Sequence, residues 1–84
     1  MSGPAPRRLG VVEAFTAVVN QCPSGAVQSV ARNALEALQR EGSRSLPEQA
    51  FRVLSAVRGW RGPVAARVKE ALEAFLAEAE ERGG

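Results

Sequence analysis

The chain has 84 residues, of which 45% are apolar and 24% charged, and its formal net charge is +2. This length and composition indicate one globular domain and exclude disorder of the whole chain. The chain contains one cysteine and no histidine, and no apolar run approaches the roughly 20 residues of a membrane-spanning helix.

These counts restrict the chemistry. Histidine is the most frequent general base and, with cysteine, a principal transition-metal ligand, so we expect a non-catalytic protein without a metal or a cofactor. Cys22 has no second cysteine for an internal disulfide, which favours a reducing compartment and a cytoplasmic location. Arg7 and Arg8 are not followed by the apolar stretch of a secretory signal, so we expect neither export nor a membrane.

The first predicted elements are a tail and a helix. Residues 1–8 include two prolines and a glycine, which predict a flexible tail. From Gly10 to Gln21 apolar residues recur at helical spacing. The apolar face of this first helix is predicted to consist of Val11, Phe15, Val18 and Cys22.

A second helix is predicted from Gly25 to Glu41. Pro23 interrupts the chain before it, and the hydroxyl of Ser24 is suited to accept a hydrogen bond from the first helical turn. Gly42 follows the last turn, where a glycine commonly ends a helix. The predicted inner face comprises Val27, Val30, Ala31, Ala34, Leu35 and Leu38.

The second half of the chain repeats this pattern. Ser45 and Glu48 have the spacing of a capping box, which predicts a third helix to about Arg58 with Phe51 beside its inner face. After a turn that contains Trp60, a fourth helix is predicted from Pro63 to about Arg82.

An internal similarity links the two halves. Residues 25–38 align with residues 62–75 at an offset of 37, which indicates a duplicated helical hairpin. We therefore predict an all-α domain over residues 9–82, with similar antiparallel hairpins at about 10–41 and 46–82. These form either a four-helix bundle or a stacked-hairpin array. The hairpins resemble in general form the HEAT and tetratricopeptide repeats, whose signature residues are absent.

Trp60 is the most distinctive candidate functional residue. It lies in an inter-helix turn and has no counterpart in the first half of the chain. One interpretation, which we favour, is that its ring covers the end of a small core. The other is an exposed anchor for a protein partner, and on that interpretation Trp60, Arg58 and Arg61 are the candidate partner-binding residues.

Charge is distributed unevenly along the chain. Residues 1–69 hold ten Lys or Arg and four Glu, whereas residues 70–84 hold five Glu and one Arg. This asymmetry is compatible with a solvated polar surface, with head-to-tail association or with an anion-binding face. The candidate nucleic-acid-binding residues are Arg44, Arg52, Arg58, Arg61 and Arg67.

Two functional hypotheses follow from the sequence. The first is a small protein-interaction or adaptor protein that self-associates, because a chain of this length buries a limited core and has an expected stability of only about 4–12 kcal/mol. The alternative is a nucleic-acid-binding regulator that uses the arginine-rich face of the second hairpin.

Overall fold

A computed structural model describes residues 9–83 of the chain and the side chains of residues 9–81. The predicted tail, residues 1–8, lies outside this range. The prediction of an all-α fold is confirmed, since the described range contains helices and turns and no strand. The elements are α1 (Val11–Gln21), α2 (Gly25–Glu41), the 3₁₀ helix η1 (Gly42–Ser45), α3 (Leu46–Ala56), the 3₁₀ helix η2 (Val57–Gly59) and α4 (Pro63–Gly83).

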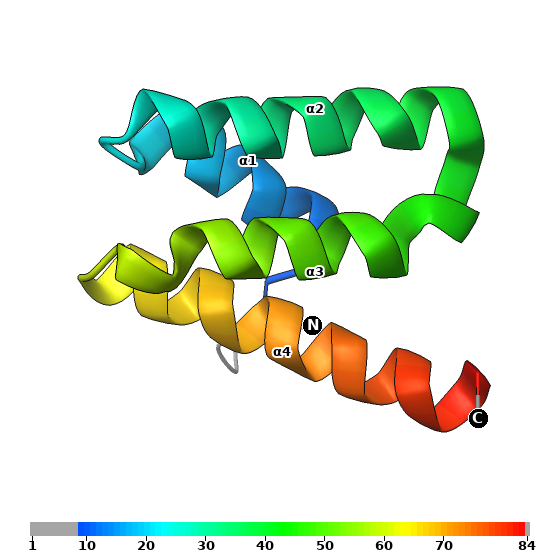
Figure 1. The fold of residues 1–84 in the computed structure, drawn as a ribbon. Helices are drawn as coiled ribbons and strands as arrows, with labels where there is room; N and C mark the ends of the chain where they lie inside the picture. The colour runs from blue at the N-terminus through cyan, green and yellow to red at the C-terminus, as the bar shows by residue number, and fades with distance from the viewer. Residues whose placement is uncertain (1–8, 84) are drawn as a thin grey trace, which may run out of the picture.

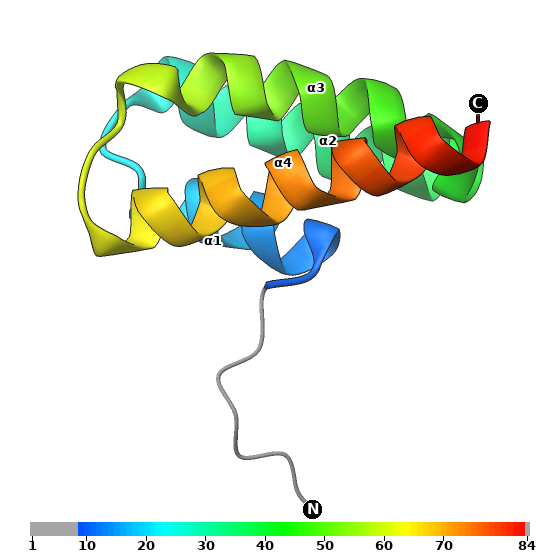
Figure 2. The ribbon, with the colours of Figure 1, turned by 90° about the horizontal axis from the view of Figure 1, so that it is seen from below.

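In the described range, the helices α1 to α4 surround one core. Both α1 and α3 pack against α2 and against α4, while α1 and α3 have little contact with each other. The α1–α2 turn and the η2–α4 turn lie at the same end of the molecule, and η1 lies at the opposite end (Figure 1). In the view from below, the beginning of α1 lies well short of the C-terminal ends of α2 and α4 (Figure 2).

The division into two separate hairpins is wrong in one respect. The segment between α2 and α3 is the 3₁₀ helix η1, whose first residue, Gly42, has non-helical backbone angles, and η2 continues α3 to Gly59. The predicted link between the hairpins is therefore a tight corner that contains a 3₁₀ helix. Ser45 already has α-helical φ and ψ angles and makes no side-chain cap, so the predicted Ser45–Glu48 capping box is absent. The Ser45 hydroxyl instead donates a hydrogen bond of 3.1 Å to the carbonyl of Gly42.

Local hydrogen bonds explain where α1 and α2 begin. The Glu13 carboxylate accepts a bond from the backbone N–H of Gly10 at 2.8 Å. The predicted cap of α2 is confirmed, because the Ser24 hydroxyl accepts a bond from the N–H of Val27 at 3.3 Å. Gly42 ends α2 with a φ of 76°, a region that favours glycine.

Small residues dominate the core. Alanine and valine supply most of the buried apolar side chains, and Phe15 and Leu72 are the largest fully buried ones. Of the seven leucines, all within the described range, only Leu72 is fully buried. Phe51, predicted beside the inner face of the third helix, is 63% exposed. Phe51 lies two positions before the buried Val53. Residues two positions apart in an α-helix point in nearly opposite directions, because each residue turns the chain by about 100°.

Candidate interaction surfaces

The first candidate surface surrounds the turn before α4. Trp60 follows η2 with extended backbone angles, and Gly62 reverses the chain with a φ of 115°. The ammonium group of Lys69 donates to the carbonyls of Trp60 at 2.7 Å and Arg58 at 3.2 Å. These bonds satisfy carbonyl groups that the end of η2 leaves without helical partners. The turn is therefore fastened to the second turn of α4.

A groove of about 520 Å³ lies beside this turn. Trp60 is half-buried, packs against the core and forms part of the groove wall. Trp60 thus contacts the core with part of its side chain and keeps another part accessible. We call this surface the Trp60 groove, and it is lined by Cys22, Pro23, Ser24, Val27, Ala56, Gly59, Trp60 and Arg61.

One exposed arginine, Arg61, belongs to the lining of the Trp60 groove. Arg58 and Arg61 stand on either side of Trp60 in the chain, and both are exposed. Of the three residues proposed from the sequence as a partner-binding set, Trp60 and Arg61 line the groove, and Arg58 is exposed two positions before Trp60.

The larger arginine set does not form one site. Arg44 belongs to η1, at the end of the molecule opposite Trp60 (Figure 1). Arg52 forms an ion pair of 2.7 Å with Glu48 on the outside of α3, as the i,i+4 spacing indicates. Arg67 is exposed on α4. Arg58 and Arg61 flank Trp60 in the chain, and both are exposed.

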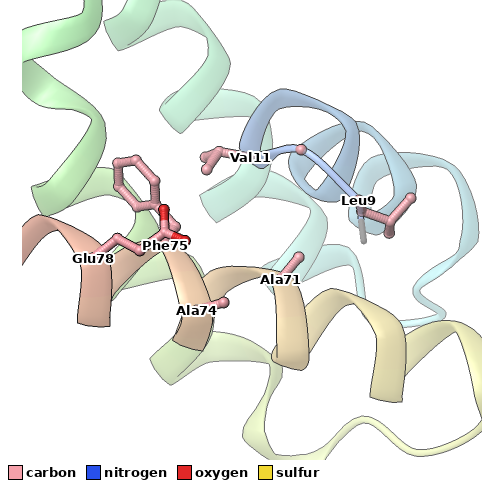
Figure 3. A pocket seen from close by; sticks show the side chains of 7 residues that line it. Leu9, Val11, Ala71, Ala74, Phe75 and Glu78 are labelled. Carbon is pink, nitrogen blue, oxygen red and sulfur yellow. The ribbon is translucent and has the colours of Figure 1, made fainter. Parts of the chain in front are cut away.

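Sequence reasoning missed a second surface, a groove of about 320 Å³ between the beginning of α1 and the middle of α4. Its residues come from opposite ends of the chain, so no local sequence pattern announces it. Phe75 lies between this groove and another of similar size at η1. We call the first one the α1–α4 groove, and Figure 3 shows its lining by Leu9, Gly10, Val11, Ala71, Ala74, Phe75 and Glu78.

Three further findings concern the chain as described. Residues 9–83 contain no helix with the length and apolarity needed to cross a membrane. Within the same range no three His, Cys, Asp or Glu side chains gather as a potential metal site. No protein-family model, no curated protein and no solved structure matches this chain.

Proposed function

We propose that the protein is a small non-catalytic interaction protein that self-associates and that binds a protein partner at the Trp60 groove. The observation that carries this proposal is the distribution of its apolar residues. Alanine and valine fill the core, while most leucines and two of the three phenylalanines keep part of their surface in water. Burial of that surface in a complex is favourable at about 25 cal/mol per Å².

Self-association also fits the size of the chain. A domain of this length has an expected stability of only about 4–12 kcal/mol. A second copy that binds only the folded state increases the free energy of unfolding. Sedimentation of the full chain from about 1 to 300 μM tests this part of the proposal. We expect the average mass to rise with concentration, and a monomer throughout the range would contradict it.

The Trp60 groove suits a partner segment with an apolar side chain next to acidic residues. Trp60 offers a large rigid surface of the kind that dominates binding energies, and Arg61 offers a cation at the border of the groove. The unpaired, buried Cys22 in its floor supports a reducing, cytoplasmic setting.

A comparison of three variants tests the groove. Partners retained by the wild-type chain should be lost with Trp60→Ala and with Arg61→Glu. They should be kept by Arg44→Glu, which makes the same charge change at the opposite end of the molecule. Equal losses in Arg61→Glu and Arg44→Glu would indicate a general charge effect and contradict a site at the groove.

A nucleic-acid-binding role is the second candidate. The observation in its favour is the exposed pair Arg58 and Arg61 beside Trp60, since arginine and aromatic side chains suit phosphate and base contacts. Titration with short duplex and single-stranded nucleic acid at low and moderate salt, followed through Trp60 emission, tests it. Salt-sensitive binding that Arg58→Glu/Arg61→Glu abolishes would support this role, and no binding at low salt would remove it.

A further inference from the structure

A further groove lies between α2 and α3. Its volume is about 380 Å³, which is within the range of ligand-binding pockets. It shares no residue with the Trp60 groove or with the α1–α4 groove. We call it the α2–α3 groove, and it is lined by Val30, Asn33, Gln49, Phe51, Arg52 and Ser55.

The lining of this groove includes a buried polar side chain, that of Gln49. The residue is 8% exposed and lies one helical turn before the buried Val53, where an apolar residue is the usual choice. Among the residues that the structure describes, none forms a hydrogen bond with its carboxamide. Ser45, which is also buried, bonds to the carbonyl of Gly42. Because buried polar side chains nearly always have a partner, the unpaired carboxamide of Gln49 indicates a group from another molecule.

The carboxamide determines what such a group must offer. Its oxygen accepts hydrogen bonds and its nitrogen donates them, so a donor and an acceptor side by side satisfy both. The peptide unit of an extended segment is such a group, because its N–H and C=O are free, whereas those inside a helix bond to each other. A second copy of this chain is a poor occupant, since its described residues are helical apart from short connections.

The rest of the lining indicates an uncharged segment with an apolar side chain. Phe51 is 63% exposed and offers aromatic surface at the groove. The charged residue of the lining, Arg52, is paired with Glu48 at 2.7 Å, so its charge is matched within the chain. The remaining polar residues of the lining are exposed and uncharged, namely Asn33 and Ser55.

We propose that the α2–α3 groove binds an extended, uncharged peptide segment of a partner protein. A backbone peptide unit of the segment bonds to the carboxamide of Gln49, and an aromatic or aliphatic side chain packs on Phe51. This site goes beyond the function proposed above, because it shares no residue with the Trp60 groove and does not select acidic residues. A segment that lacks the donor or the acceptor leaves the buried carboxamide unpaired and is rejected for that reason.

Selection from a library of random linear heptapeptides displayed on phage tests the groove. The full chain is the bait, and prior depletion on the Gln49→Met variant removes peptides that bind elsewhere. We expect the enriched peptides to share an aromatic or aliphatic residue, with no excess of Asp or Glu. Fluorescence anisotropy of the most enriched peptide should show binding about ten-fold weaker to Gln49→Met and to Phe51→Ala. Failure to enrich any peptide would overturn the proposal.

Backbone N-methylation of that peptide tests the pairing with Gln49. Methylation removes one N–H donor and is applied at each position in turn. At one position it should weaken binding to the wild-type chain about ten-fold, and binding to Gln49→Met by less than about three-fold, because the hydrogen bond is already lost in that variant. Equal losses for the two chains at every position would contradict the amide pair.

Two control variants separate the groove from general effects. Gln39→Met makes the same chemical change at an exposed position of α2, and Val12→Ala shortens an exposed apolar residue outside the groove. Both should keep the dissociation constant within about two-fold of the wild-type value. Binding should also change by less than about two-fold between about 50 and 300 mM salt, since salt screens interactions between exposed charges. A steep salt dependence would contradict an uncharged segment.

Thermal unfolding of Gln49→Met gives a readout that does not depend on the peptide. The substitution replaces an unpaired buried carboxamide by an apolar side chain of similar size, and it should raise the midpoint temperature by at least about 3 °C. Higher stability combined with weaker peptide binding supports the proposal. An unchanged or lower midpoint would mean that the carboxamide is already satisfied in the free chain, and it would overturn the proposal.

Discussion

The side chain of Lys69 on α4 donates a hydrogen bond of 2.7 Å to the backbone carbonyl of Trp60. A second bond of 3.2 Å reaches the carbonyl of Arg58. One flexible cation thus fixes the turn that holds the aromatic residue and its basic neighbours. Lys69 is one of the ten Lys and Arg residues of positions 1–69, and its ammonium group is engaged within the molecule.

We expect Lys69→Met to lower the free energy of unfolding by about 1–2 kcal/mol. The substitution keeps an aliphatic side chain but leaves two carbonyls without their charged donor. Urea unfolding at a protein concentration low enough to hold the chain as a monomer measures the change. Arg32→Met is the control, because Arg32 is exposed on α2 and away from this turn. Equal destabilisation by both substitutions would contradict a specific role for Lys69.

The turn also depends on Gly62. Its φ of 115° is a conformation that side-chain-bearing residues rarely adopt, so Gly62→Ala should lower the free energy of unfolding by about 1–3 kcal/mol. Gly59→Ala is the matched control. A methyl group at Gly59 meets no atom within 4 Å, and the φ of that residue is not positive. The control should stay within about 0.5 kcal/mol of the wild type, and a similar loss in both would rule out strain at Gly62.

Truncation of two phenylalanines to alanine should change the stability by very different amounts. Phe15 is fully buried and Phe51 is 63% exposed. Phe15→Ala should lower the free energy of unfolding by about 3–5 kcal/mol through lost burial and a cavity, a large part of the stability of so small a domain. Phe51→Ala should change it by less than about 1 kcal/mol. Thermal unfolding of both variants measures the difference, and a large effect at Phe51 would mean that this ring is covered in solution.

The local features of this fold were predictable from the sequence. Helical spacing and the hydroxyl of Ser24 predict a helix over Gly25–Glu41, which is the range of α2 in the structure. Both signals come from residues only a few positions apart in the chain. At Ser45 the same reasoning gives the right start for α3, which begins at Leu46, but the predicted capping hydrogen bond is absent because Ser45 ends the 3₁₀ helix η1.

One of the two candidate surfaces could be predicted from the sequence and the other could not. Arg58, Trp60 and Arg61 are neighbours in the chain, so their proximity needed no knowledge of packing. The α1–α4 groove joins Leu9 to Phe75, which the packing of α1 on α4 brings together. Relative helix lengths are visible in the sequence, but the choice of packing partners is a tertiary property that periodicity does not encode.

The reactivity of Cys22 tests whether Trp60 protects the end of the core. Cys22 is 2% exposed and shares the Trp60 groove with that ring. In the native protein a thiol reagent should therefore react at least about a hundred-fold more slowly than in the urea-unfolded chain, since reaction requires an opening of the structure. We expect Trp60→Ala to raise the native rate about ten-fold, by a local opening that costs less than global unfolding.

Lowered global stability alone also accelerates the reaction, so the control must match the loss of stability. Gly62→Ala serves this purpose, because it destabilises the same turn and retains the ring. A reaction rate that rises further in Trp60→Ala than in a Gly62→Ala variant of equal stability identifies the indole as the cover of Cys22. Equal rates would mean that the ring contributes only to global stability, and its half-exposed face would then be better explained as a surface for the partner.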